Sequence, residues 1–223
     1  MVRIYIVHHE VYLFSEFLTY IFVHYILNMI DISELEVFFI NEYDYLGKHK
    51  KTKELLNKNI NKLQGAKIKI ITEREIDIFS FFEKDNQIPL SFYCDYIKYY
   101  YLLNSDLRYC LYIDLDTIIS DESIQFILNN PNSFYIEKSG CSNLIYLDKD
   151  NKEEAERIFK IMIDLGIYEY FKLKGDFYAG NLIKEKYKKL SHESHTDITP
   201  CSYIIKRDPN VDLITQARMR LSK

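Results

Sequence analysis

Two carboxylates separated by one residue follow an apolar, strand-like run in the middle of the chain. The run Tyr109–Ile113 is aromatic and aliphatic, and Asp114 and Asp116 come directly after it. Residues i and i+2 of a strand point the same way, so the two carboxylates can converge where the strand opens into a loop. Anions held this close repel unless a cation lies between them. The pattern therefore predicts a site for Mg²⁺ or Mn²⁺, which also bind phosphate oxygens.

The segment before this strand carries a second acid and a base. Residues 89–103 have the composition of a helix that packs on a sheet, and they contain Asp95 and Lys98 three positions apart. That spacing places the two side chains on one face of the helix, either in a pocket or as an ordinary surface ion pair. The acid pair also has a structural alternative, in which Asp114 and Asp116 begin a solvated turn or cap the next helix.

The order of helix, short turn, strand and Asp-x-Asp resembles the GT-A glycosyltransferases. The nearest group is the retaining families of glycogenin-like galactosyltransferases, initiating mannosyltransferases and glucosylating toxins, whose helix begins with a Ser-Asp-x-x-Arg-like motif. Asp95 matches the acid of that motif, and Lys98 stands where the families have arginine. Lysine offers one point charge where arginine offers a planar group with two parallel donors. The positive charge at this position is therefore kept, but the geometry of its contacts changes. The resemblance implies a metal-dependent hexosyltransferase that uses a nucleotide-diphosphate sugar, with UDP expected as the nucleotide.

The resemblance also implies a set of donor-binding residues. In GT-A enzymes the loop after the first strand lines the nucleotide pocket. The stretch 175–183 is similar to the small-residue Phe-x-Ala-Gly stretch that lies under the sugar pocket. The expected donor-binding residues are Val7, His8, His9, Asp95, Lys98, Asp114, Leu115 and Asn181.

Further residues are candidates for the metal shell and for proton transfer. Either His192 or His195 could complete the shell formed by Asp114 and Asp116, because Mn²⁺ accepts an imidazole beside carboxylates. Asp176 could bond a sugar hydroxyl, with a glycine-containing core bulge as the structural alternative. An inverting reaction would need a base near the acceptor. The candidate bases are Asp176, Asp148 and Asp150.

Alternating strand and helix patterns predict the fold. Strands are expected at 3–7, 35–40, 66–71 and 109–113, with helices at 11–30, 48–63 and 89–103 between them. This order indicates a doubly wound, mostly parallel α/β sheet, which binds ligands at the carboxyl ends of its strands. A smaller mixed part follows, with a helix at 121–128, strands at 133–137 and 143–147, and a helix at 152–165 that Gly166 ends.

Composition limits the function classes and the compartment. The chain has 223 residues, a net charge of −4, 28% charged and 48% hydrophobic residues. These values exclude a disordered chain and a basic nucleic-acid binder. We expect one domain over 1–223, with a nucleotide-binding half at 1–120 and an acceptor-side half at 121–223. Its partners would be a nucleotide-sugar donor and a glycan, lipid-linked or protein acceptor.

The cysteines and the apolar segment near the N-terminus bear on localisation. Four dispersed cysteines predict reduced thiols, and no secretory signal is recognisable. The apolar stretch 11–30 is long enough to span a membrane, but charged and polar residues interrupt it, which favours a helix packed on the sheet. We therefore expect a cytoplasmic protein, with peripheral binding at the inner face of a membrane as the alternative.

Two other functions share parts of this pattern. Phosphohydrolases of the haloacid dehalogenase type also carry Asp-x-Asp after an apolar strand. Their motif belongs to the first strand and has Thr or Val two residues after the second acid, where this chain has Ile118. A GT-A-like binding module without turnover is the other alternative, because Lys98 departs from the family pattern.

Overall fold

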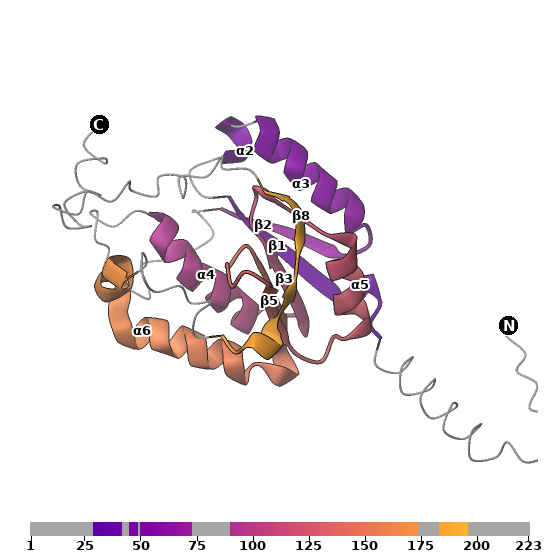
Figure 1. The fold of residues 1–223 in the computed structure, drawn as a ribbon. Helices are drawn as coiled ribbons and strands as arrows, with labels where there is room; N and C mark the ends of the chain where they lie inside the picture. The colour runs from indigo at the N-terminus through magenta and orange to yellow at the C-terminus, as the bar shows by residue number, and fades with distance from the viewer. Residues whose placement is uncertain (1–28, 42–44, 49, 73–89, 174–182, 196–223) are drawn as a thin grey trace, which may run out of the picture.

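A six-stranded sheet forms the centre of the protein (Figure 1). The computed structural model describes residues 29–41, 45–48, 50–72, 90–173 and 183–195. The sheet has the order β2-β1-β3-β6-β5-β7, and a separate two-stranded ribbon consists of β4 and β8. The strands are β1 (Leu35–Asn41), β2 (Lys67–Thr72), β3 (Tyr109–Ile113), β4 (Thr117–Ile119), β5 (Phe134–Glu137), β6 (Leu144–Asp148), β7 (Lys188–Leu190) and β8 (His192–His195).

Helices cover both faces of the sheet. The α-helices are α2 (Tyr45–Lys48), α3 (Lys50–Lys62), α4 (Leu90–Asn104), α5 (Asp121–Asn129) and α6 (Glu153–Leu173). Three short 3₁₀ turns, η1 (Ile32–Glu34), η4 (Lys149–Asn151) and η6 (Glu185–Tyr187), complete the described elements.

The strand directions confirm a mixed α/β fold with a mostly parallel sheet. β1 pairs in parallel with β2 and with β3, and β7 pairs in parallel with β5. β6 is antiparallel to both of its neighbours, β3 and β5. Of the six strands, β6 alone is therefore reversed. Its first residue lies beside the last residue of β3, in the pair Ile113 and Leu144.

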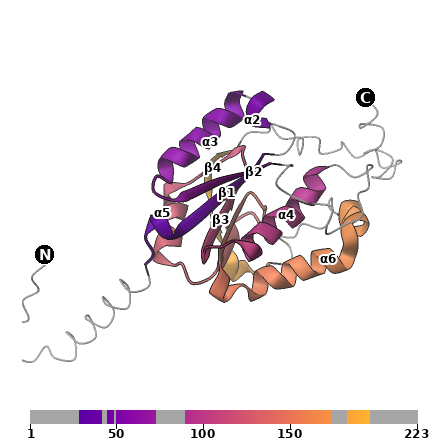
Figure 2. The same ribbon diagram turned by 180° about the vertical axis from the view of Figure 1, so that it is seen from behind.

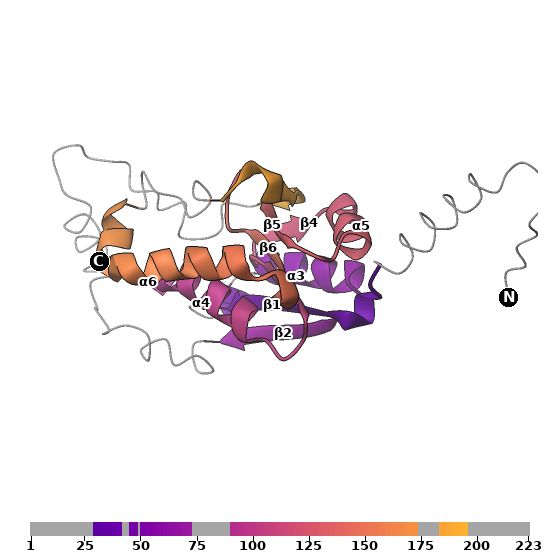
Figure 3. The same ribbon diagram turned by 90° about the horizontal axis from the view of Figure 1, so that it is seen from below.

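The core has two halves, one on each face of the sheet. Side chains alternate along β1, so that Phe38 and Ile40 face α4 and α6, whereas Val37 and Phe39 face α3 and α5. All four are buried. The view from behind shows the same arrangement (Figure 2), and from below α6 lies along α4 (Figure 3). The central strands are therefore apolar on both faces, as a covered parallel sheet requires.

Most predicted elements in the described ranges are confirmed. The predicted strands at 35–40, 66–71, 109–113, 133–137 and 143–147 correspond to β1, β2, β3, β5 and β6, and the predicted helices correspond to α2 with α3, α4, α5 and α6. At Gly166 the backbone leaves the helical conformation, with φ 71° and ψ 158°, before α6 continues to Leu173. The predicted strand 3–7 and nearly all of the predicted helix 11–30 lie outside the described residues.

The described cysteines behave as structural thiols. In the part of the chain that the structure describes, Cys94 and Cys110 are buried thiols that form no disulfide, and Cys141 is a partly buried thiol that forms none. Burial raises the pKa of the Cys110 thiol to about 11, so this thiol stays protonated at neutral pH. Among the described helices, none is both long and apolar enough to cross a membrane.

Candidate active site

The Asp-x-Asp motif forms a turn at the carboxyl end of β3. The strand ends at Ile113, and the Thr117 N–H donates to the Asp114 carbonyl oxygen at 3.1 Å. The Asp114 N–H donates to the Asn143 carbonyl oxygen at 2.9 Å, which ties the turn to the start of β6. The two acids therefore lie in a turn, and the alternation of a strand does not set their directions. We call residues 114–117 the acidic turn.

Lys98 of α4 joins the acidic turn to a second carboxylate. Its Nζ lies 3.2 Å from Asp114 Oδ1 and 3.5 Å from Asp95 Oδ1. The same ammonium is 3.3 Å from both the carbonyl oxygen and the Oγ of Ser142. The side chains of Lys98 and Asp95 are 7% and 9% exposed, so this is a buried cluster. A surface ion pair, the alternative for Asp95 and Lys98, is excluded.

The Lys98 ammonium remains charged in this environment. Burial by itself would lower the pKa of Lys98, but the negative charges of Asp114 and Asp95 outweigh it and raise that pKa above its ordinary value. The ammonium also lies 4.8 Å from the centre of the Tyr112 ring, which adds a cation–π contact. Lys98 is therefore a permanent positive charge beside Asp114 at neutral pH.

Tyr112 and Ser142 belong to the same cluster, and sequence reasoning missed both. The Tyr112 hydroxyl donates to Asp114 Oδ1, from two residues earlier in the chain. The Ser142 Oγ donates to Asp95 Oδ1 at 3.3 Å. Ser142 arrives through the turn between β5 and β6, where Gly140 adopts a φ of 83° that favours glycine. The i, i+2 spacing of Tyr112 and Asp114 was a usable signal, whereas Ser142 had none.

The other two residues of the motif are more deeply buried than Asp114. Asp116 is 2% exposed, and the Thr117 hydroxyl lies 3.3 Å from Asp116 Oδ1. The Asp114 side chain is 23% exposed and is the part of the motif that is open to solvent. The Leu115 side chain packs into the core with α3 and α5, so only the backbone of Leu115 is available to a donor. The helix-cap alternative is wrong, because the Ser120 Oγ caps α5 by accepting from the Ser123 N–H at 3.1 Å.

The β4–β8 ribbon orders the two candidate histidines. His195 pairs with Thr117, the residue after Asp116, whereas His192 pairs with Ile119. The His192 ring lies beside Glu137 at the end of β5, with Nδ1 3.2 Å from Glu137 Oε1. Backbone register therefore places His195 nearer the acidic turn than His192. Among the described side chains, which do not include that of His195, no three His, Cys, Asp or Glu form a group that could hold a metal ion.

Several predicted site residues lie outside the described residues. They are Val7, His8, His9, Asp176 and Asn181.

Asp148 and Asp150 do not lie near the acidic turn, because Asp148 pairs with Tyr109 at the opposite end of β3. Arg108 binds both oxygens of Asp148, through Nε at 2.8 Å and Nη2 at 3.1 Å. Arg108 Nη1 also lies 2.9 Å from Asp150. The proposal of either acid as a catalytic base at this site was wrong, since both belong to a structural ion-pair cluster.

The Arg108–Asp148 pair is expected to contribute to stability in a pH-dependent way. Burial opposes ionisation of the fully buried Asp148, but hydrogen bonds from Arg108 and Asn151 outweigh it and lower the pKa of Asp148 below 3.8. This stabilisation is present above the unfolded-state pKa and is lost as the pH falls through the folded-state pKa. Arg108→Met should therefore lower the free energy of unfolding by about 2 kcal/mol at neutral pH, and by less in acid.

Urea unfolding of the wild type and the variant at neutral pH and near the pKa of a free carboxyl group tests this prediction. Asp150→Asn is the matched control, because it removes the exposed partner of the same arginine and should change stability by less than about 1 kcal/mol. An Arg108→Met effect that stays constant with pH would contradict the role of the ionised Asp148.

Comparison with known proteins places two glycosyltransferase structures beside this fold. One is the glycosyltransferase GlyE of Streptococcus pneumoniae TIGR4, with 15% identity and a TM-score of 0.38 over 69% of this chain and 43% of that chain. The other is a glycosyltransferase involved in the glycosylation of the major capsid of PBCV-1, with 15% identity and a TM-score of 0.35 over 61% of this chain and 75% of that chain. The present chain thus spans less than half the length of GlyE. No family model matches it, and no curated protein does.

Proposed function

We propose that this protein is a metal-dependent glycosyltransferase that transfers a sugar from a nucleotide-diphosphate donor, with a UDP-sugar as the expected donor. One observation carries the proposal. Asp114 of the acidic turn pairs with Lys98 of α4, and Lys98 also pairs with Asp95, so that residues of both motifs form one cluster. The carboxyl ends of parallel strands are where α/β sheets bind ligands. This proximity supports the proposal that the two motifs, which resemble those of the glycosyltransferases, belong to one site.

The residues present suit a hard divalent cation. Carboxylate oxygens are ligands that Mg²⁺ and Mn²⁺ prefer, and Asp114 and Asp116 bring two such groups to one turn. Asp114 and Asp95 outnumber Lys98, so the formal charge of their cluster is negative. Tyr112 and Lys98 both contact Oδ1 of Asp114, so Oδ2 is the oxygen that we assign to the metal. Asp116 would supply the second carboxylate, and His195 is the candidate for a third ligand.

The protein residues around this ion would orient the donor. A bound divalent ion neutralises the charge that grows on the leaving diphosphate. Asp95 would accept hydrogen bonds from donor hydroxyls, while Ser142 and Lys98 hold its Oδ1. The Asp114 carboxylate would keep one orientation because Tyr112 and Lys98 both contact its Oδ1. Such fixed groups lower the entropic cost of reaching the reactive geometry.

The contacts of Lys98 change the role that we assign to it. An ammonium has three N–H donors, and Asp114, Asp95 and Ser142 surround this one. A direct contact with donor phosphates would require Lys98 to leave one of these partners. We therefore propose that Lys98 acts through Asp114 and Asp95, as a positioning residue.

Nucleotide binding is the most direct test of the proposed function. With Mn²⁺, a UDP-sugar at about a hundred times its dissociation constant should raise the melting temperature by about 5 °C or more. UDP should retain most of this effect, because the diphosphate carries most of the charge that the metal binds. Chelation by EDTA should remove it. A thermal-shift screen of nucleotide sugars, with Mn²⁺ and with EDTA, measures all three results.

Two outcomes of this screen would contradict the proposal. Equal stabilisation with Mn²⁺ and with EDTA would show that binding does not depend on a metal. The absence of any shift with every nucleotide sugar and every free nucleotide diphosphate would argue against a donor site. Adenosine with Mn²⁺ is a suitable control ligand, because it lacks the diphosphate.

A further inference from the structure

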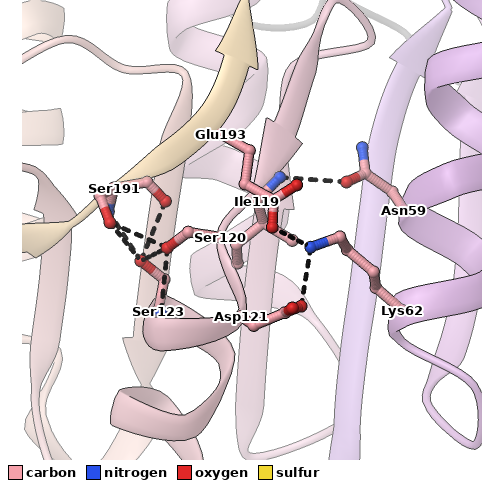
Figure 4. A network of polar contacts seen from close by, with 8 residues as sticks. All are labelled: Asn59, Lys62, Ile119, Ser120, Asp121, Ser123, Ser191 and Glu193. Atoms are coloured by element: carbon pink, nitrogen blue, oxygen red, sulfur yellow. Dashed lines mark hydrogen bonds and ion pairs between the residues drawn. The ribbon is translucent and has the colours of Figure 1, made fainter.

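Asn59 of α3 contacts the backbone of the strand that follows the acidic turn. Its Nδ2 donates to the Thr117 carbonyl oxygen at 2.7 Å, and its Oδ1 accepts from the Ile119 N–H at 3.1 Å. Figure 4 shows Asn59 reaching from α3 to Ile119. Asn59 is fully buried, with 0% of its surface exposed. Both ends of one carboxamide thus bind one strand.

These two bonds pair a side chain with backbone groups of β4. In the described part of the chain, β4 pairs with β8 alone, so its other edge has no neighbouring strand. The Thr117 carbonyl and the Ile119 N–H lie on that edge, and both residues are buried away from water. Unpaired backbone groups in such a place are costly. The carboxamide of Asn59 supplies one donor and one acceptor, as an adjacent strand would.

The position of Asn59 within α3 points to a role beyond helix stability. The buried face of α3 consists of Thr52, Leu55, Leu56 and Asn59. A leucine at position 59 would continue the apolar face, and asparagine is a poorer helix former than leucine. Neither the propensity of α3 nor its packing therefore requires a carboxamide at this position. The backbone of β4 does.

A chain of bonds connects Asn59 to the two acids. Asn59 holds the carbonyl of Thr117, and the N–H of the same residue closes the acidic turn on Asp114 O at 3.1 Å. Asp116 is the residue immediately before Thr117. Movement of Thr117 would therefore move both carboxylates of the motif.

A second residue of α3 holds the other end of the ribbon. Lys62 Nζ lies 2.7 Å from Asp121 Oδ1 and also pairs with Glu193 of β8. Ser120, Ser123 and Ser191 bond one another at this same end of the ribbon (Figure 4). None of these contacts reaches the acidic turn. Lys62 therefore offers a matched control on the same helix and the same ribbon.

We propose that Asn59 is the positioning residue of the acidic turn. It would hold Thr117 in place and thereby fix Asp114 and Asp116 for the metal. The claim that Asn59 holds the turn stands on the geometry alone, whereas its consequence for metal binding rests on the proposed function.

Amide hydrogen exchange of the full chain tests the first claim. The reporter is the Thr117 N–H, which bonds to Asp114 and has no direct contact with Asn59. Asn59→Leu should accelerate its exchange by about tenfold or more relative to the amides of β3, which report global opening. Asn59→Ala is the second variant in case leucine does not fit the space. Lys62→Met should leave the Thr117 amide at the wild-type rate, measured against the same reference.

Manganese binding, read from the electron paramagnetic resonance signal of the free ion, tests the consequence. Asn59→Leu should weaken Mn²⁺ binding by about tenfold, as the loss of a group that orients a ligand does, and Lys62→Met should not. A folded Asn59 variant whose Thr117 amide exchanges within twofold of wild type would overturn the inference. Faster exchange in a protein whose wild type binds no Mn²⁺ would support Asn59 as the anchor of the turn and would instead refute the proposed metal site.

Discussion

Asp114→Asn and Asp116→Asn are each expected to lower the rate of UDP-sugar hydrolysis or transfer by about a hundredfold or more. Each variant removes one negative charge from the acidic turn and one oxygen that, under the proposed function, would bind the metal. Little packing is lost, since asparagine has almost the same shape as aspartate. The measurement is release of UDP from the donor that gives the largest thermal shift, with Mn²⁺ present.

Asp106→Asn is the matched control for these variants. Asp106 is an exposed aspartate between α4 and β3, at the end of β3 remote from the acidic turn, and its loss should leave the rate unchanged. Circular dichroism and thermal unfolding would show that all three variants keep the fold. A rate within a factor of two of wild type for either Asp114→Asn or Asp116→Asn would refute the metal assignment.

Lys98→Met is expected to be the most destabilising single change near the site. It would leave Asp95 and Asp114 facing each other without the buried cation between them. Removal of one partner from a buried ion pair costs about 3–5 kcal/mol. Replacement of Asp95 by asparagine in the same variant should restore part of this loss, since one of the two uncompensated charges is then gone. Urea unfolding of the single and double variants measures both effects.

The pH dependence of the Lys98 contribution follows from the direction of its pKa shift. The folded-state pKa of Lys98 is raised, so its stabilisation is fully present below the unfolded-state pKa of about 10.4. It would be lost only as the pH rises through the folded-state value. The difference between wild type and Lys98→Met should therefore not decline from neutral to mildly alkaline pH. Lys160→Met, at an exposed position of α6, is the control, and an effect of Lys98→Met no larger than this control would contradict the buried cluster.

The main sheet was predictable because its strands carry strong local signals. β1 and β3 are largely apolar on both faces, and β2 alternates lysine with isoleucine, as suits its place at the edge of the sheet in the described part of the chain. The ribbon was not predictable in this way. β4 has three residues, and β8 consists of His192–His195, which has no apolar pattern at all. A contact with a distant segment, not local composition, makes these residues into strands.

The residues of the candidate site also differ in whether local sequence reveals them. Asp95, Lys98 and Asp114 could be found because they lie within two motifs separated by a short stretch of chain, and the structure does bring them together. The burial of Lys98 could not be read from the sequence, since its i, i+3 spacing with Asp95 fits a surface helix equally well. Ser142 lies 44 residues after Lys98, and Asn59 lies 58 residues before Thr117. Both contacts therefore depend on how the helices pack on the strands.

Because β6 runs opposite to the other strands, the segments before and after it lie at opposite ends of the sheet. Each segment can therefore be altered without changing the other. Before β6, Asn143 bonds the acidic turn and Ser142 contacts Lys98, whereas the residues after β6, 149–151, lie at the opposite end of the strands beside Arg108. A fluorescent label or an affinity tag in the segment 149–151 would therefore be remote from the acidic turn. The same insertion three residues before β6 would fall among the residues that hold Asp95 and Lys98.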